Sequence, residues 1–355
     1  MYSGNINNKN ILYLDRNENQ YGPSPACLKE FITTDIKKLS EYSRDFMMGY
    51  KSRLSDRLAT EYGVNEKNVI LGYGGEDLLK QAVHCYVHKG DKIMIPSYSW
   101  WYYKKIADEV EGIKVEYPIV EDKDTFYYDI DVMLKVYHKH KPKLVLISSP
   151  NNPTGNRLEQ DQLNQVLEVM RDTVVVLDEA YSLFFNGDNT YLEELIAKFP
   201  NLLIIRTFSK YHALAGLRIG FALIGENHVR FSLFSSRYLG FNCLSERMAI
   251  AALDSEEYYM EVREKMAKDM EMYFHEFNTI PGFKAYRSYA NFILVQIPVK
   301  IKDKLENYLT ENGVIIKFMA EDGLNNHIRI TIGRQEQNRL LMDLIRSFLK
   351  ESNML

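Results

Sequence analysis

TFSKYHALAGLRIGF, residues Thr207–Phe221, lies between two apolar runs that predict strands, Leu202–Arg206 and Ile219–Ile224. Lys210 therefore follows the carboxyl end of a buried strand and does not lie on a solvated helix. A lysine in that position loses hydration unless its pKa falls or its amine forms a covalent imine. Both properties belong to lysines that act as nucleophiles, so we expect a reactive amine at Lys210.

Anion-binding groups surround this lysine in the sequence. Thr207 and Ser209 supply two hydroxyl groups, and Arg218 follows Gly216, where a small residue lets the backbone turn the guanidinium back toward the lysine. The alternative is a surface lysine in a polar loop. A site for a phosphate and an amine is expected only if partners occur elsewhere in the chain.

The composition is that of a globular protein with small-molecule partners. The chain has 355 residues, 46% of them hydrophobic and 26% charged, and its net charge of -4 gives no argument for nucleic acid or membrane binding. It shows no signal-peptide pattern and no apolar run of membrane-spanning length. Cys27, Cys85 and Cys243 lack metal-ligand spacing, so we expect reduced thiols, a cytoplasmic location and no metal site.

Strand-like and helix-like segments alternate through the middle of the chain. The strands read as continuous apolar runs, which is typical of a mostly parallel sheet covered on both faces. The predicted strands are Val69–Leu71, Lys92–Ile95, Val115–Ile119, Leu144–Ser148 and Val174–Leu177, and the predicted helices start near Glu76, Tyr102 and Glu159. The sequence therefore predicts an α/β domain.

The pattern changes from Leu244 onward. One long charged helix is expected to end near Asn278, followed by strands at Phe292–Gln296 and Ile328–Thr331. A last helix is predicted from a stripe of Leu340, Leu341, Leu344, Ile345, Phe348 and Leu349. We expect a smaller α+β domain at 251–355, a large domain at 41–250, and an N-terminal arm at 1–40 that joins the small domain.

Two motifs near strand ends suggest ligand contacts. In YGGEDLL, the backbone N–H groups of Gly74, Gly75 and Glu76 are placed to bind an anion at a helix N-terminus, although a tight turn needs glycine in any case. In PSYSWWYY, we interpret Trp100 and Trp101 as packing or pocket wall. Tyr98, nearest the strand end, is the candidate to stack on a flat ligand.

Other polar motifs occupy similar positions. In LDRNENQYGPSP, Tyr21 belongs either to a surface loop or to the cover of a pocket. SSPNNPTG follows an apolar strand and supplies Asn152. In VVVLDEAY, Asp178 enters a low-dielectric region and needs a cationic or hydrogen-bonding partner, and Tyr181 follows it. The alternative role for Asp178 is a helix N-cap.

Parallel strands bring their carboxyl ends to one crevice, which would gather Asn152, Asp178, Tyr181, Lys210 and Arg218. This set combines an amine nucleophile, an acid for a ring nitrogen, donors for a ring oxygen and a phosphate site. Such a combination matches pyridoxal 5'-phosphate (PLP).

The chain resembles the fold type I, class I/II PLP-dependent aminotransferases, and among them the histidinol-phosphate aminotransferases. The motifs quoted above, followed by HIRITIG near the C-terminus, occur in the family's order nearly from end to end. The resemblance implies a PLP-transferase fold, transfer of an amino group from a small-molecule donor to a keto acid, and a homodimer with shared active sites.

The resemblance also implies a role for each matching residue. Lys210 would carry the cofactor and move the substrate proton, Asp178 would pair with the ring nitrogen, and Tyr98 would stack on the ring. Asn152 and Tyr181 would contact the ring oxygen. The expected phosphate ligands are Gly75, Glu76, Thr207, Ser209, Arg218 and, from the neighbouring subunit, Tyr42. The expected substrate contacts are Tyr21, Lys317 and Arg329.

Three departures limit these expectations. The phosphate loop has glycine at Gly75 where the family usually has serine or alanine. The sequence around Tyr42 differs from the family pattern, so Tyr50 is a rival for its role. Lys317 stands where histidinol-phosphate enzymes have an arginine, which weakens that substrate assignment. A PLP-dependent decarboxylase or lyase of a phosphorylated amino acid, of the threonine-phosphate decarboxylase kind, is the alternative.

Overall fold

A computed structural model describes residues 11–49, 51–185, 189–237 and 239–352. Its larger sheet has seven strands in the order β2-β10-β9-β8-β7-β3-β4. In that order they are Val69–Gly72, Gly220–Ile224, Leu202–Thr207, Val174–Asp178, Leu144–Ser148, Lys92–Pro96 and Ile113–Tyr117. Only β10 runs antiparallel to its neighbours, and the other pairs are parallel. The predicted α/β fold is confirmed.

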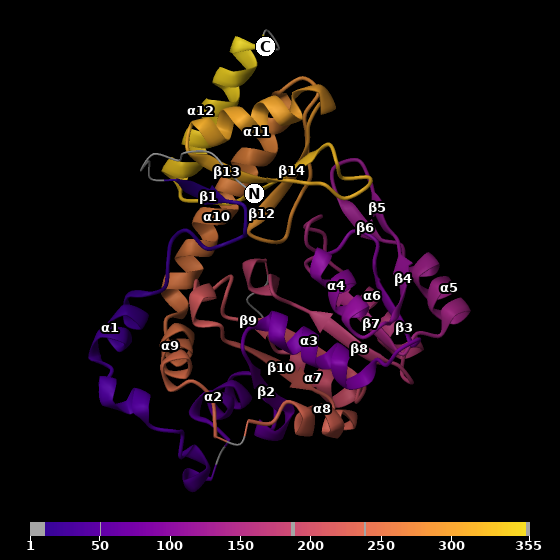
Figure 1. Cartoon of the computed structure of the whole chain (residues 1–355), viewed down its shortest axis with the longest axis vertical. Helices are drawn as coiled ribbons and strands as arrows, with labels where there is room; N and C mark the ends of the chain where they lie inside the picture. Colours follow the sequence, from indigo (N-terminus) through magenta and orange to yellow (C-terminus); the bar gives the residue numbers. More distant parts are fainter. Residues whose placement is uncertain (1–10, 50, 186–188, 238, 353–355) are drawn as a thin grey trace.

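Helices cover both faces of the larger sheet, as the continuous apolar strands predict (Figure 1). In β7, Leu144 and Leu146 belong to one buried cluster, whereas Val145 and Ile147 belong to the other. The first cluster includes side chains of α3 (Gly75–Tyr86), α4 (Trp101–Glu109) and α8 (Val229–Phe234). The second includes side chains of α2 (Arg53–Glu61), α5 (Ile130–His140), α6 (Gln160–Val169), α7 (Tyr191–Lys198) and α9 (Cys243–Leu253).

A smaller sheet lies above the larger one in Figure 1, with strand order β1-β13-β14-β12-β11. The strands are Leu12–Leu14, Val314–Phe318, His327–Thr331, Phe292–Gln296 and Lys284–Ala285. Its helices are α10 (Glu256–Thr279), α11 (Lys302–Glu311) and α12 (Gln335–Glu351). Because β1 pairs in parallel with β13, the N-terminal segment joins this sheet. The division at residues 40 and 250 remains a proposal about separate domains.

Three predictions of secondary structure need correction. The run Val115–Ile119 is split, because β4 ends at Tyr117 and β5 (Ile119–Glu121) pairs with β6 (Phe126–Tyr128) as a hairpin. The predicted long helix is two helices, α9 and α10. They separate at Asp254 and Ser255, where the Ser255 hydroxyl donates to the Ala251 carbonyl. Leu340 is 47% exposed, and Met342 lies in the buried stripe of α12.

The N-terminal segment after β1 crosses from one sheet to the other. It forms α1 (Pro25–Thr33), which lies against α9, and then two short 3-10 turns, Ile36–Ser40 and Asp45–Met48. Among the described residues, no helix has both the length and the apolar character needed to cross a membrane.

Candidate active site

A cavity of about 650 Å³ opens at the carboxyl ends of β7, β8 and β9 and reaches the smaller sheet; we call it the main cavity. Parallel pairing brings these strand ends to one edge of the sheet. The predicted residues that line it are Gly75, Glu76, Asn152, Asp178, Tyr181, Thr207, Ser209, Lys210, Arg218, Lys317 and Arg329. The structure therefore gathers residues from both sheets around one space.

Lys210 follows β9 and extends its amine toward the N-terminal segment. Its Nζ donates a hydrogen bond of 2.8 Å to the backbone carbonyl of Arg16. Burial, together with the positive charges of Arg329 and Arg218, lowers the pKa of Lys210 to about 8. A minor fraction of the amine, larger than for an ordinary lysine, is therefore unprotonated near neutral pH and can act as a nucleophile or a base.

Asp178 is the last residue of β8 and is buried. Its carboxylate accepts hydrogen bonds from the Tyr103 hydroxyl (2.6 Å) and the Ala180 N–H (3.0 Å). Burial raises the pKa of Asp178, and no cation of the described chain forms an ion pair with it. It does not cap a regular helix, because the next helical turn begins after Tyr181. Such a carboxylate fits a cationic ring nitrogen.

A chain of hydrogen bonds joins the two sheets across the cavity. The Tyr181 hydroxyl accepts from Asn17 Nδ2 at 2.9 Å and from Asn152 Nδ2 at 3.5 Å. Arg329 donates to Asn152 Oδ1 at 2.5 Å and to the Asp15 carbonyl at 2.6 Å. Tyr181 and Asn152 are thus held beside each other, where both can reach one ring oxygen.

The N-terminus of α3 forms an anion-binding cradle with Arg218. Gly74 has φ 84°, and no side chain caps the helix at this position. A Cβ on Gly74 would lie 2.8 Å from Arg218 Nη2, so only glycine lets the guanidinium approach. Thr207 Oγ1 and Ser209 Oγ lie 2.9 Å apart on the same side of the cavity. Free N–H groups, hydroxyls and a guanidinium together suit a phosphate.

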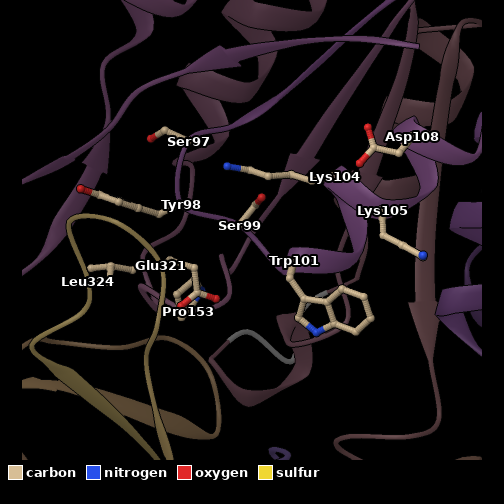
Figure 2. Close-up of a pocket in the computed structure, with 10 residues that line it drawn as sticks. All are labelled: Ser97, Tyr98, Ser99, Trp101, Lys104, Lys105, Asp108, Pro153, Glu321 and Leu324. Atoms are coloured by element: carbon tan, nitrogen blue, oxygen red, sulfur yellow. The ribbon is translucent and has the colours of Figure 1, made fainter. Parts of the chain in front are cut away.

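Tyr98 does not line the main cavity, so its predicted stacking on the ring stays a prediction. It lines a smaller adjoining cavity of about 310 Å³, which we call the side chamber (Figure 2). Its ring packs edge-on against Phe126, and its hydroxyl lies against Gly323. Trp101, the first residue of α4, lines both cavities and is 58% exposed, so its indole is the better candidate to stack on a cofactor ring.

The other predicted tyrosines do not line the main cavity of this subunit. Tyr21 packs against the core of the smaller sheet, where burial and the charges of Asp269 and Glu336 raise its pKa. The expected substrate contact is therefore not seen. Tyr42 is 68% exposed on the surface. Its rival Tyr50 lies outside the described residues.

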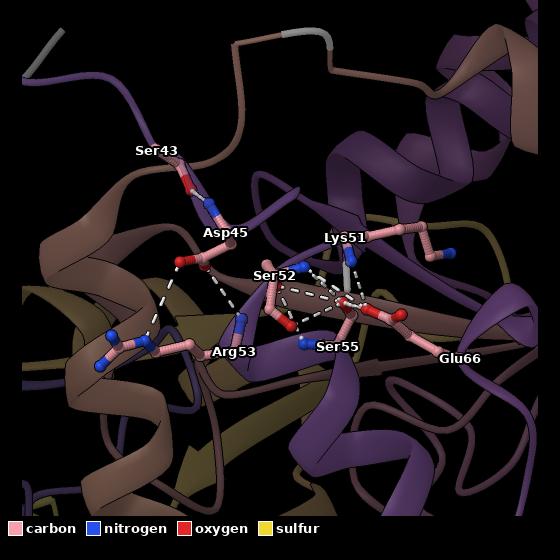
Figure 3. A network of polar contacts seen from close by, with 7 residues as sticks. All are labelled: Ser43, Asp45, Lys51, Ser52, Arg53, Ser55 and Glu66. Atoms are coloured by element: carbon pink, nitrogen blue, oxygen red, sulfur yellow. Dashed lines mark hydrogen bonds and ion pairs between the residues drawn. The ribbon is translucent and has the colours of Figure 1, made fainter. Parts of the chain in front are cut away.

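A polar network fixes the chain just beyond Tyr42 (Figure 3). The Glu66 carboxylate accepts hydrogen bonds from the Lys51 N–H (2.8 Å) and the Ser55 hydroxyl (2.5 Å). Asp45 accepts from the Arg53 N–H at 3.1 Å. Because these bonds tie the segment to α2, Tyr42 is presented at the surface near a defined anchor.

The sequence reasoning missed three contributors. Arg16 and Asn17 hold Lys210 and Tyr181, yet the motif that contains them was interpreted only through Tyr21. The signal available was a polar segment rich in asparagine, and Asn17 adopts φ 56°, a conformation that asparagine tolerates. Tyr103 was grouped with the aromatic cluster, whereas its hydroxyl binds Asp178.

The comparison with known families agrees with this geometry. The model of the aminotransferase class I and II family matches residues 9–345. The chain belongs to this family. The aminotransferase is 33% identical to a histidinol-phosphate aminotransferase of Ruminiclostridium cellulolyticum over 336 residues, covering 93% of this chain and 90% of that protein. It is 31% identical to one of Geobacillus, covering 97% and 92% of the two chains.

Solved structures place the aminotransferase in the same fold. The histidinol-phosphate aminotransferase of Sinorhizobium meliloti in complex with PLP has a TM-score of 0.84 at 25% identity, covering 96% of this chain and 92% of that chain. The L-threonine-O-3-phosphate decarboxylase of Porphyromonas gingivalis has a TM-score of 0.81 at 20% identity, covering 96% and 100%, and shares the fold. The aminotransferase depends on PLP and acts on small molecules.

The described residues fit PLP. The cradle of α3, Thr207, Ser209 and Arg218 suits the phosphate, and the buried Asp178 carboxylate lacks the cation that a pyridinium nitrogen would supply. Lys210 supplies an amine with a lowered pKa. When bound, PLP supplies an aldehyde and an electron-withdrawing ring.

Proposed function

We propose that this aminotransferase takes its amino group from a compound that also carries an acidic group. Lys317 and Arg329 are register partners on β13 and β14, and both line the main cavity. Like charges directly opposite each other destabilise a sheet unless an anion lies between or near them. The pairing of these two cations is the main support for the proposal. A phosphate or carboxylate of the substrate would reduce the repulsion between them.

The surroundings of Arg329 support the same conclusion. The residue is buried, its pKa is lowered by burial, and its Nε has no hydrogen-bond partner among the described residues. The alternative was an ion pair with an acid of the small domain, and no such pair occurs in the described chain. A buried guanidinium bound only to neutral oxygen atoms is costly unless a ligand anion completes its shell.

Histidinol phosphate is the amino donor that we favour. The relatives named above support it, since each is named a histidinol-phosphate aminotransferase. The Lys317 ammonium is a point charge, whereas an arginine would offer a planar pair of donors. Arg329 would therefore contribute more than Lys317 to the binding of a phosphate. The acceptor would be a keto acid.

The proposed mechanism assigns one task to each of three side chains. Asp178 would pair with the ring nitrogen of bound PLP, because a buried carboxylate favours a cation beside it. The unprotonated Lys210 amine would remove the proton from the substrate carbon that bears nitrogen, and the resulting Lys210 ammonium would hold that proton inside the cavity. Arg329 fixes the acidic end of the substrate, so that the reacting carbon stays within reach of Lys210.

Decarboxylation on the same scaffold is the second candidate. The decarboxylase of P. gingivalis shares the fold, and its identity to this chain is too low to support its activity here. Both reactions would use Lys210 and Asp178. They differ in the bond that is broken, so release of carbon dioxide from a phosphorylated amino acid would favour decarboxylation.

A half-reaction screen tests the proposed function. Holoenzyme is mixed with histidinol phosphate, with acidic amino acids, and with amines that lack an acidic group. Only donors with a phosphate or carboxylate should convert the cofactor absorbance to that of the pyridoxamine form. Equal conversion by amines without an acidic group would refute the proposal.

We also propose a homodimer with shared active sites. The segment from α1 to the second 3-10 turn exposes a band of apolar side chains, namely Leu28, Phe31, Ile32, Ile36, Leu39, Tyr42, Met47 and Met48. Exposed apolar side chains gathered on one segment are typical of a protein interface. A second copy is the natural partner, because two-fold symmetric dimers are the commonest oligomers. Sedimentation at assay concentration tests this proposal, and an active monomer would refute it.

A cytoplasmic location is part of the same proposal. It is supported by Cys27, Cys85 and Cys243, none of which forms a disulfide.

A further inference from the structure

The side chamber adjoins the main cavity. Ser99, Trp101, Pro153 and Glu321, labelled in Figure 2, line both spaces, and we infer that a ligand held at Arg329 and Lys210 can extend past them. The volume of about 310 Å³ is sufficient for a ring-sized group. None of the roles assigned to cofactor-binding residues requires this space.

The walls of the side chamber suit a planar group. Trp101 is 58% exposed and offers an aromatic ring, while Pro153 and Leu324 add apolar surface. Ser99 is 5% exposed, and its Oγ has no hydrogen-bond partner among the described residues. A buried hydroxyl without a partner is unfavourable, and a ligand N–H group at the junction would satisfy it.

One acidic side chain at the junction, Glu321, forms no ion pair within the described chain. Lys104 is paired with Glu116 at 2.8 Å, and Asp108 is paired with Lys114 at 2.6 Å. Lys105 points away from the junction in Figure 2. The Glu321 carboxylate accepts a hydrogen bond from the adjacent Ala320 N–H at 3.1 Å, and no cation of the described chain lies within ion-pair distance of it.

We propose that the side chamber binds a planar cationic group of the amino donor, of the amidinium or guanidinium type. Glu321 is its counter-ion, Ser99 accepts one of its N–H groups, and Trp101, Pro153 and Leu324 form the apolar wall beside it. This inference rests on the proposed function. It extends the substrate class to donors with an acidic group at Arg329 and a planar cation at the other end.

Intrinsic fluorescence gives a test that needs no turnover. The chain has two tryptophans, so Trp100→Phe leaves Trp101 as the reporter. Holoenzyme with this substitution is titrated with benzamidine, benzamide and benzoate, which share one shape and differ in charge. None of them can donate an amino group. Benzamidine should quench Trp101 saturably and bind more tightly than either of the other two.

Glu321→Gln should weaken benzamidine binding about fivefold, the effect of losing one partly exposed ion pair, and leave benzamide unchanged. Asp108→Asn is the matched control, because Asp108 lines the same chamber but is already paired with Lys114. Its effect on benzamidine should be negligible. An unchanged affinity in Glu321→Gln, or tighter binding of benzoate than of benzamidine, would overturn the proposal.

Competition kinetics then locate the binding site. Benzamidine should raise the KM of the amino donor and leave kcat unchanged, because both occupy the junction. Quenching without competition would show a separate site and overturn the assignment to the donor. Since benzamidine binding is measured without turnover, it can succeed or fail independently of the donor screen.

Discussion

The guanidinium of Arg206 contacts Glu179 Oε2 through two nitrogen atoms, Nε at 2.8 Å and Nη2 at 2.7 Å, and both side chains are more than nine-tenths buried. Tyr191 donates to the other carboxylate oxygen at 2.8 Å. Glu179 directly follows Asp178, and Arg206 directly precedes Thr207. The pair therefore fixes the ends of β8 and β9, and with them two residues of the main cavity, relative to each other.

We expect Arg206→Ala to lower the free energy of unfolding by about 3–5 kcal/mol, because the buried Glu179 carboxylate would lose its partner. Urea unfolding of the holoenzyme measures this. Lys89→Ala breaks the exposed pair with Glu111 and should cost less than about 1 kcal/mol. Equal unfolding midpoints for the two variants would show that the buried Arg206–Glu179 pair contributes no more to stability than an exposed pair.

The reaction of Lys210 with added PLP should depend on pH through the pKa of its amine. With a pKa of about 8, the amine is mostly protonated below pH 7, so the rate should rise and level off above pH 8. Arg329→Ala removes a positive charge that lowers this pKa, so the midpoint should move upward. Stopped-flow absorbance gives the rate of the reaction. Borohydride reduction followed by mass spectrometry identifies the residue to which PLP is attached.

Arg157→Ala is the control for this pH profile, since Arg157 pairs with Glu159 and contributes nothing to the Lys210 pKa. A midpoint that stays fixed in Arg329→Ala would contradict the electrostatic link. Attachment of PLP to any residue other than Lys210 would contradict the assignment of Lys210 as the cofactor-binding lysine.

Asp178→Asn should stabilise the protein without cofactor and slow the holoenzyme. Burial raises the pKa of Asp178, so the folded state binds more protons than the unfolded state, and stability falls as pH rises from about 4 toward the raised pKa. Asparagine removes this cost at neutral pH. Thermal unfolding without PLP should show a higher midpoint, and half-reaction rates should fall by tenfold or more, about 1.4 kcal/mol of the barrier. A variant with near-normal rates would show that the carboxylate charge is not needed.

Trp101→Ala should weaken PLP binding more than Tyr98→Ala does. Trp101 lines the main cavity, whereas Tyr98 packs against Phe126 outside it. Loss of a stacked ring costs about 1 kcal/mol, or about fivefold in affinity. Equilibrium dialysis of PLP measures both variants, and Tyr98→Phe controls for the hydroxyl. A larger effect of Tyr98→Ala would restore the original prediction.

Arg329→Ala should raise the KM for the amino donor at least tenfold and leave the affinity for PLP nearly unchanged, because the guanidinium would bind the substrate's acidic group. Lys317→Arg offers a planar fork at the register-paired position and should lower the KM for histidinol phosphate. If Arg329→Ala instead lost PLP at an unchanged KM, Arg329 would belong to the scaffold.

The sequence was sufficient for the sheet and for most of the cavity because both depend on local pattern. Continuous apolar runs indicate strands buried on both faces, and polar residues just after such runs meet at one edge. Lys210, Asp178 and Asn152 were all found in this way. Their placement needs only parallel pairing, which the alternation of strands and helices predicts.

Sequence patterns do not reveal side-chain directions that depend on tertiary contacts. Tyr98 is nearer the strand end than Trp101, but the turn into α4 carries Tyr98 toward Phe126 and Trp101 toward the cavity. Tyr21 was assigned by resemblance, whereas its ring packs into the core of the smaller sheet. The split at Ser255 depends on a hydroxyl contact with Ala251 that periodicity does not reveal.

The pairing of β1 with β13 has a consequence for protein synthesis. Leu12 is aligned with Val314, so an early segment of the chain docks only after most of the remainder has left the ribosome. Asp15, Arg16 and Asn17 follow β1 directly and contact Arg329, Lys210 and Tyr181. A nascent chain can thus form the larger sheet with its lysine in place while one wall of the cavity is missing. The ability to hold a substrate is acquired last, when the two ends of the polypeptide meet.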